Sequence, residues 1–193
     1  MDHVRLGTVV KCQISARGLI QEKRYVAADI VDADELHLGP DGVVGWCAGR
    51  AVLNHHHRLN PRMTTWKPHR LLSVGFTGHY AAMAERFGEA RLGSAAENVI
   101  VDCDRIVPLD EVAPGLQVRC ADGAVIDLTG ATVAKPCVPF TKFLLGDQDA
   151  PDETVAPNRA FLGDGMRGYV MGLADQTEPA VIRPGDELFA VVG

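Results

Sequence analysis

The sequence predicts a mainly β protein, a β-barrel with a few short helices. Short segments rich in β-branched and other apolar residues recur along the 193 residues, and glycine and proline separate one segment from the next. Many short strands divided by turn residues are typical of a β-barrel or sandwich. The segments expected as strands are residues 4–14, 24–31, 98–102, 116–120, 124–128, 168–173 and 187–192.

Two turns join expected strands. Asp122-Gly123 stands between the fourth and fifth of these segments, and Asp-Gly is a favoured pair for a tight hairpin turn. A second hairpin is expected over residues 171–192, where Pro184-Gly185-Asp186 forms a turn that leads into the last strand.

Two helices are expected between the strands. In residues 77–88 four apolar side chains recur at the spacing of one helix face, with Thr77 as a cap and Gly88 at the end. These residues, expected in the core, are Tyr80, Met83, Ala84 and Phe87. A shorter helix is expected after Pro139, because Phe140, Phe143 and Leu144 recur at helical spacing and a proline in the first turn loses no hydrogen bond. The acidic residues 144–158 are expected to form a solvated loop.

Composition favours a single cytoplasmic domain over residues 1–193. The chain has 19 basic and 25 acidic residues, a net charge of −6, which argues against a nucleic-acid partner because phosphate contacts need concentrated positive charge. Its five cysteines are odd in number and show no C-x-x-C pair, so we expect reduced thiols. The apolar run in MDHVRLGTVVKCQ is too short for a signal peptide or a membrane span, and no membrane partner is expected.

Cys137 is the first candidate for chemistry. It lies in the sequence Lys135-Pro136-Cys137-Val138-Pro139, and the two prolines leave its backbone few conformations. A stiffly held thiol suits a metal ligand or a nucleophile, and the nearby lysine could favour the thiolate or receive an anion. The alternative is a buried cysteine that packs as a small apolar group. The remaining cysteines are expected to be packing thiols: Cys12, Cys47, Cys103 and Cys120.

Three consecutive histidines form the second candidate. If the run is extended, His55 and His57 share one face and His56 points the other way, so two imidazoles could bind one metal ion. A third ligand would have to come from a distant residue. The alternative is a solvated polar loop whose histidines, with Arg58 and Arg62, bind an anion or nothing.

Two further positions carry polar side chains beside expected strands. Glu97 and Asn98 lead into the third strand, where an ordinary turn is the simpler interpretation. Arg167 lies among glycines, which favour either a close approach to phosphate or a tight bend. The sequence has no G-x-x-x-x-G-K-[ST] loop, no G-x-S-x-G elbow and no H-E-x-x-H motif.

The order of several short motifs is more specific than any one of them. They are GVVG at 42–45, TGHYAAMAERFG, AENVIVD, GATVAKPCVPF, GMRGYVMGLAD and IRPGDELFAV. Together they resemble the MOSC domain over about residues 5–192, and the most specific matches are Glu97-Asn98, Pro136-Cys137 and Arg167-Gly168. This family is named after the C-terminal domain of molybdenum cofactor sulfurases, and it includes amidoxime-reducing proteins and small stand-alone bacterial members.

The resemblance implies a closed or nearly closed β-barrel that binds a molybdenum cofactor. Cys137 matches the family's cysteine that is proposed to ligate molybdenum or to carry sulfur as a persulfide, and soft thiolate sulfur suits that metal. Residues of the matched motifs and nearby cations would hold the cofactor: Lys135, Asn98, Glu97, Arg167 and Arg58.

The chain departs from the family pattern at three places. Trp46 stands where members often have an Asp, and Ala96 stands where they tend to have a Gly. Ala134 and Lys135 stand where members have an Arg shortly before the Pro-Cys pair.

Three functions follow as alternatives. The first is an oxidoreductase that reduces N-hydroxylated small-molecule substrates such as amidoximes, with electrons from a separate electron-donor protein. The second is a sulfur carrier in which Cys137 receives a persulfide from a cysteine desulfurase. The third is a binding module whose site has decayed. If the site exists, Cys137, Asn98 and Arg167 are expected to meet in one cavity.

Overall fold

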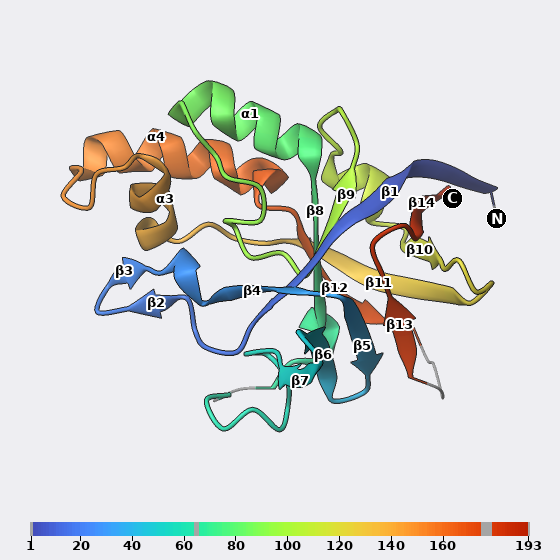
Figure 1. Cartoon of the computed structure of the whole chain (residues 1–193). Coiled ribbons are helices and arrows are strands. Elements are labelled where there is room, and N and C mark those ends of the chain that lie inside the picture. The colour runs from blue at the N-terminus through green and yellow to red at the C-terminus, as the bar shows by residue number, and fades with distance from the viewer. Residues whose placement is uncertain (1, 64–65, 175–178, 193) are drawn as a thin grey trace.

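Seven strands form a closed barrel at the centre of the fold (Figure 1). The structure, a computed structural model, describes residues 2–63, 66–174 and 179–192. In chain order the barrel strands are β1 (Asp2–Ser15), β8 (Leu72–Phe76), β9 (Val99–Asp102), β10 (Leu116–Arg119), β11 (Val125–Val133), β12 (Tyr169–Leu173) and β14 (Glu187–Val192). Their order in the sheet is β14-β10-β11-β12-β8-β9-β1, and pairing of β1 with β14 closes the barrel. The predicted mainly β fold with a few short helices is confirmed.

The barrel is mixed, because β8 and β9 run parallel while its other neighbouring strands are antiparallel. Strand β4 (Ile30–Ala33) extends the sheet beside β1. A second sheet has the order β13-β5-β6-β7, and a third contains only β2 and β3. These strands are β2 (Ile20–Gln21), β3 (Arg24–Tyr25), β5 (Glu35–Gly39), β6 (Gly42–Cys47), β7 (Arg50–Leu53) and β13 (Ala180–Ile182).

Four short helices lie between the strands. They are α1 (Thr77–Phe87), α2 (Leu109–Val112), α3 (Val138–Leu144) and α4 (Asp152–Phe161). Figure 1 shows α1, α3 and α4 gathered on one flank of the barrel, while β5, β6 and β7 lie at its opposite end. None of the helices in the described ranges is long and apolar enough to cross a membrane.

The alternation of side chains along β9 separates two apolar clusters. Val99 and Val101 belong to the cluster inside the barrel, whereas Ile100 between them packs with the residues under the helices. Successive side chains of a strand point to opposite faces, so one strand contributes to both clusters. Met83 of α1 and Phe140 of α3 are fully buried in the outer cluster. The outer cluster therefore fixes the helices against the barrel.

The predicted helices are confirmed, with one correction at a cap. Helix α1 ends at Gly88, whose φ of +84° is a conformation that favours glycine. Thr77 does not cap this helix; it is the first helical residue, and its hydroxyl accepts a 2.9 Å hydrogen bond from the Cys103 N–H. Helix α3 begins at Val138 and has Pro139 in its first turn, as expected.

The prediction of a solvated loop over residues 144–158 is wrong for its second half, which begins α4. Asp152 and Glu153 lie in the first turn of this helix, where negative charge favours the helix dipole. Val155 is buried, and a 2.7 Å hydrogen bond from Arg86 of α1 to Asn158 holds the exposed side. Tertiary contacts thus outweigh the acidic composition.

Each predicted strand segment contains a strand, but one of the two predicted hairpins is wrong. Asp122-Gly123 does join β10 and β11, with a φ of +88° at Gly123. The hairpin over residues 171–192 is not formed, because β13 pairs with β5 and β14 pairs with β1 and β10. Residues 175–178 of that prediction lie outside the described ranges.

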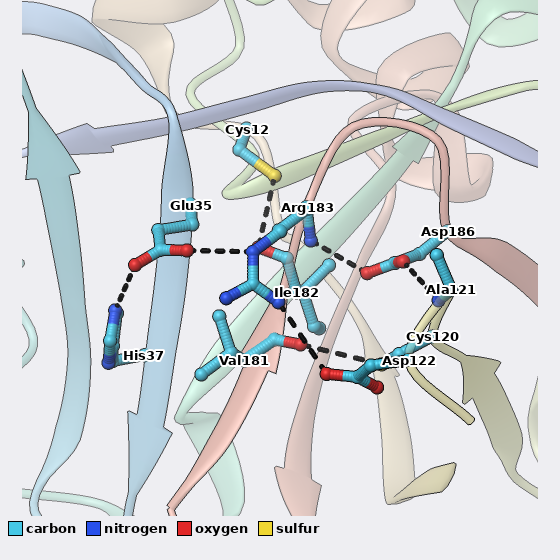
Figure 2. A network of polar contacts seen from close by, with 10 residues as sticks. All are labelled: Cys12, Glu35, His37, Cys120, Ala121, Asp122, Val181, Ile182, Arg183 and Asp186. Carbon is cyan, nitrogen blue, oxygen red and sulfur yellow. Dashed lines mark hydrogen bonds and ion pairs between the residues drawn. The ribbon is translucent and has the colours of Figure 1, made fainter. Parts of the chain in front are cut away.

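Asp186 fixes the turn before β14 by accepting hydrogen bonds from two backbone N–H groups (Figure 2). Its carboxylate, in a residue only 3% exposed, lies 3.0 Å from the N–H of Ala121 and 2.7 Å from that of Arg183. Ala121 belongs to the β10–β11 hairpin and Arg183 follows β13. The carboxylate therefore joins the barrel to the smaller sheet.

Arg183 strengthens the same connection. Its guanidinium lies 2.7 Å from the carboxylate of Glu35 on β5, and Glu35 lies 2.7 Å from the ring of His37 (Figure 2). The hydrogen bonds with His37 and Arg183 lower the pKa of Glu35.

Two buried thiols also bind the smaller sheet. Cys12 donates a hydrogen bond to the carbonyl of Ile182, and Cys120 donates one to the carbonyl of Val181, both on β13.

We predict that Asp186→Ala lowers the free energy of unfolding by about 2 kcal/mol, because two backbone N–H groups lose the buried carboxylate that accepts their hydrogen bonds. Asp186→Asn retains one carbonyl oxygen and is expected to lose less. Urea unfolding followed by circular dichroism measures both, with Asp104→Ala at an exposed position as the control. A loss at Asp186→Ala no larger than that of the control would contradict this role.

Candidate functional site

A cavity of about 640 Å³ lies where the segments after β1, β7 and β11 meet those before β8, β9 and β12. This volume is in the range of small-molecule sites. Five of the residues predicted for the site line it: Cys137, Lys135, Glu97, Asn98 and Arg167. The expected meeting of Cys137, Asn98 and Arg167 is therefore observed.

Cys137 ends the segment after β11 and precedes the first residue of α3. Its carbonyl oxygen accepts hydrogen bonds from both the backbone N–H and the hydroxyl of Thr141, each at 3.1 Å. These bonds add to the restriction that the neighbouring prolines impose. The residue is half-buried and borders the cavity, so its thiol is positioned to meet a ligand.

The other four thiols are buried, in agreement with their interpretation as packing residues. Burial raises the pKa of Cys12 and of Cys120 to about 12 and also raises the pKa of Cys47. All five cysteines are free thiols.

Arg167 connects three segments of the cavity wall. Its guanidinium donates hydrogen bonds to the carbonyl oxygens of Lys135 at 3.0 Å and of Ala95 at 3.1 Å. It also lies over the ring of Phe140, 4.4 Å from the ring centre. Its Nε atom is buried and has no partner among the residues that the structure describes. The side chain is held in place and retains unused N–H groups.

Glu97 places a buried carboxyl group beside the cavity. One carboxyl oxygen, Oε2, accepts a 2.6 Å hydrogen bond from the hydroxyl of Tyr80, which itself accepts a 3.2 Å bond from the N–H of Ala95. The other, Oε1, has no partner within the described ranges. A side chain at Gly75 could not be accommodated, because its Cβ would lie 2.6 Å from Oε1.

The burial of Glu97 changes its protonation. Burial raises the pKa of this carboxyl to about 7, although the Tyr80 hydrogen bond and the charge of Arg167 act in the opposite direction. The pKa of Tyr80 is also raised well above its usual value, chiefly by burial. Glu97 therefore holds a proton over part of the neutral pH range.

Asn98 has a structural role at the cavity wall. Its side-chain oxygen accepts hydrogen bonds from the N–H and hydroxyl of Ser73, at 3.1 and 3.0 Å. Its amide group donates to the carbonyl of Gln13 at 3.3 Å. Asn98 thus ties β1, β8 and β9 together at the end of the barrel that opens into the cavity.

Ala96, one of the departures from the family pattern, adopts a backbone conformation that favours glycine. Its φ is +66°, in the left-handed region. Ala96 and Ala134 both line the cavity, whereas Trp46 is exposed on β6 and is not part of the lining. Two of the three departures therefore bear directly on the site.

The histidine run forms a turn, in agreement with the alternative of a polar loop and not with an extended chain. His55 and His56 line the cavity with their ring centres 5.1 Å apart, while His57 is buried elsewhere and accepts a hydrogen bond from the N–H of Leu59. Within residues 2–63, 66–174 and 179–192, no group of three or more His, Cys, Asp or Glu residues could hold a metal ion. The alternative of a metal site at the histidine run therefore finds no ligand set among those residues.

Arg58 does not reach the cavity, although it was expected to hold the cofactor. Its guanidinium lies 3.3 Å from the carboxylate of Asp41, and its backbone N–H donates to the Asp41 carbonyl at 2.7 Å. This turn directs the side chain away from the lining. Three other arginines, Arg17, Arg62 and Arg70, line the cavity instead.

The charge of the lining contrasts with that of the chain. Five cationic side chains and one carboxyl group line the cavity, while the chain as a whole has a net charge of −6. The cations are Arg17, Arg62, Arg70, Lys135 and Arg167, and the carboxyl group is Glu97. A local excess of positive charge indicates an anionic ligand.

Comparisons with known proteins support the fold. No protein-family model matches the chain, and no curated protein matches its sequence. YuaD from Bacillus subtilis aligns over 99% of both chains with a TM-score of 0.62 at 16% identity. YiiM from Escherichia coli aligns with a TM-score of 0.52 at 15% identity, over 96% of this chain and 70% of its own. The chain therefore shares its fold with these two proteins. At these identities the similarity concerns the fold alone.

We predict that Glu97→Gln changes how stability depends on pH. The carboxyl pKa is raised in the folded protein, so its contribution to stability is present below about pH 4.5 and is lost as pH rises towards about 7. Glutamine keeps an acceptor for Tyr80 and does not ionise. The stability of the variant relative to wild type should therefore rise by about 3 kcal/mol between pH 4 and pH 8.

Chemical denaturation at the two pH values measures this difference, with Glu89→Gln at an exposed position as the control. An offset between Glu97→Gln and wild type that stays constant over the range would show that the carboxyl ionises normally.

We also predict that Ala96→Gly raises the free energy of unfolding by up to about 1 kcal/mol, because glycine removes the cost of a left-handed alanine. Ala81→Gly, at an exposed position of α1, should have the opposite sign. Thermal and urea unfolding compare the two variants. Destabilisation of similar size in both would rule out strain at Ala96.

Proposed function

We propose that the protein is a molybdenum-cofactor-binding oxidoreductase that reduces N-hydroxylated small molecules, with Cys137 as the metal's protein ligand. The observation that carries this proposal is that a half-buried thiol, a half-buried guanidinium and a lysine border one cavity. The residues are Cys137, Arg167 and Lys135. The MOSC-like fold and the order of the sequence motifs support it.

The residues of the cavity fit such a cofactor. The volume of about 640 Å³ is ample for a pterin-sized ligand. The Cys137 sulfur is a suitable soft ligand for a redox-active metal. Arg167 and Lys135 would hold the phosphate of the pterin, since guanidinium and ammonium groups bind phosphate through charge-assisted hydrogen bonds. The unpartnered Nε of Arg167 offers a further donor.

When bound, the cofactor supplies a two-electron redox centre that the side chains cannot provide. Reduction of an N-hydroxylated compound breaks the N–O bond, consumes two electrons and two protons, and releases the reduced nitrogen compound and water. A separate electron-donor protein provides the electrons. Cys137 is held on a rigid backbone, Arg167 is oriented by two carbonyls, and Glu97 holds a proton beside the cavity near neutral pH.

A sulfur carrier is the second candidate, because Cys137 is the one cysteine of the five that is not buried. A cysteine desulfurase would transfer a sulfur atom to the Cys137 thiolate, forming a persulfide, and an acceptor nucleophile would then remove the outer sulfur and restore the thiolate. Mass spectrometry after incubation with a desulfurase and cysteine tests this function. Absence of an added sulfur atom on Cys137 would exclude it.

We predict that protein purified from a host that makes the cofactor contains molybdenum and pterin in equal amounts. Cys137→Ser should abolish reduction of benzamidoxime, because the sulfur ligand is removed, while Cys47→Ala should retain it. Metal analysis, pterin fluorescence and a reductase assay measure these properties. Wild-type protein without molybdenum and pterin would contradict the proposed function.

A further inference from the structure

Two groups of nitrogen-bearing side chains lie in the wall of the cavity. One group surrounds the thiol: Arg167 bonds to the carbonyl of Lys135, and both Arg167 and Cys137 affect the pKa of Tyr25 electrostatically. The other consists of His55, His56, Arg62 and Arg70, which we call the histidine–arginine cluster.

Contacts within the histidine–arginine cluster define it as a unit. The rings of His55 and His56 meet at an angle of 67°. Both imidazole pKa values are lowered by burial, and the positive charges of Arg62 and Arg70 lower those of His55 and His56 respectively. The ring of His55 also lies close to Gly18, where an added Cβ would be 3.4 Å away.

Both arginines of this cluster are exposed, so their guanidinium groups can reach a ligand. Neither Arg62 nor Arg70 has a side-chain hydrogen bond or ion pair with any residue that the structure describes. Arg58, in the same segment as Arg62, is paired with Asp41. Both unpaired guanidinium groups border the cavity.

His55 provides an independent sign of a missing ligand. Its Nδ1 atom is buried and has no hydrogen-bond partner within the described part of the chain. Its backbone, in contrast, is fixed by N–H bonds to the carbonyl of Ser15 at 2.6 Å and the side chain of Asn54 at 3.0 Å. A buried polar atom without a partner is costly, and a ligand group would satisfy it.

The positive charge of the cavity exceeds what one phosphate group can neutralise. A phosphate monoester carries about two negative charges at neutral pH. Lys135 and Arg167 match that charge at the thiol end, which leaves the three remaining arginines of the lining without a counter-charge. A metal ion would be repelled by the arginines beside the imidazoles, so the unmatched group is an anion.

We propose that the histidine–arginine cluster is a second anion subsite, which binds a phosphate or carboxylate group of the substrate. The protein would then act on acidic small molecules. The identification of this ligand as a substrate rests on the proposed function, whereas the anion subsite itself does not. Arg62 and Arg70 are specificity-determining residues in this proposal, because they contact the charged end of the substrate and not the reacting atoms.

The test compares three ligands of similar size by isothermal titration calorimetry at pH 7 and low ionic strength, in a buffer free of phosphate. Phenyl phosphate and benzoate are anions, and benzamide is neutral. The purified 193-residue chain is titrated as wild type and as the double variant Arg62→Gln/Arg70→Gln. Lys67→Gln, an exposed cation of the same segment that is not in the lining, is the matched control, and Lys135→Gln tests the thiol end.

We expect the anions to bind wild type at least tenfold more tightly than benzamide, and the double variant to lose at least tenfold in affinity for them. Lys67→Gln should change that affinity less than threefold. Binding of phenyl phosphate alone would assign phosphate esters, and binding of benzoate as well would include carboxylates. Thermal unfolding of each variant checks that it is folded, and single substitutions replace the double variant if it is not.

Equal binding of benzamide and the two anions would overturn the inference, as would a double variant that binds like wild type. Loss of anion binding only in Lys135→Gln would place the anion at the thiol end and overturn it too. These outcomes are independent of molybdenum and pterin content, because the titration needs no cofactor. Failure of the proposed function and failure of this inference are therefore distinguishable.

Discussion

The hydrogen bonds of the Arg167 guanidinium are the interaction on which the cavity depends. They join the segment that precedes β12 to the carbonyls of Lys135 and Ala95, and so bring together three stretches that are far apart in the sequence. The bend that places Arg167 there needs glycine at Gly168, where a Cβ would lie 2.1 Å from the carbonyl oxygen of Val74. The close packing of Gly168 against β8 thus places a cation beside the Cys137 segment.

The barrel and the site are connected through the polar residues at that end. Asn98 joins three strands, and Glu97 is held by Tyr80 from the helix that packs outside the barrel. A buried carboxyl in a cavity lined by five cations gives the cavity two chemical properties, a store for a proton and an affinity for negative charge. Both properties suit a reaction that consumes protons and binds an anionic cofactor or substrate.

Sequence reasoning predicted the barrel and most of the thiol end of the site, because these depend on local patterns. Strand alternation, the Asp122-Gly123 turn and the prolines around Cys137 act over a few residues. Helix α4 was missed because its acidic composition resembles a loop, and its stability comes from packing of Val155 and a bond to Arg86. The pairing of β13 with β5 joins segments more than 140 positions apart, which no local pattern indicates.

The histidine–arginine cluster could not be predicted from the sequence. Arg70 belongs to no motif, and its place in the lining follows only from the barrel topology. Arg58 and Arg62 are four positions apart in one polar segment, yet only Arg62 borders the cavity because Asp41 binds Arg58. An extended histidine run would place His55 and His57 on one face, but the turn that forms brings the rings of His55 and His56 together.

The central claim is that the Cys137 thiol opens into a positively charged cavity, and alkylation rates test it most directly. The rates at Cys137 with anionic iodoacetate and neutral iodoacetamide are measured by mass spectrometry, in the folded protein at low ionic strength and in the unfolded chain. The account predicts that folding raises the iodoacetate-to-iodoacetamide rate ratio by about tenfold or more, since the cavity concentrates anions. A ratio no higher in the folded protein than in the unfolded chain would contradict it.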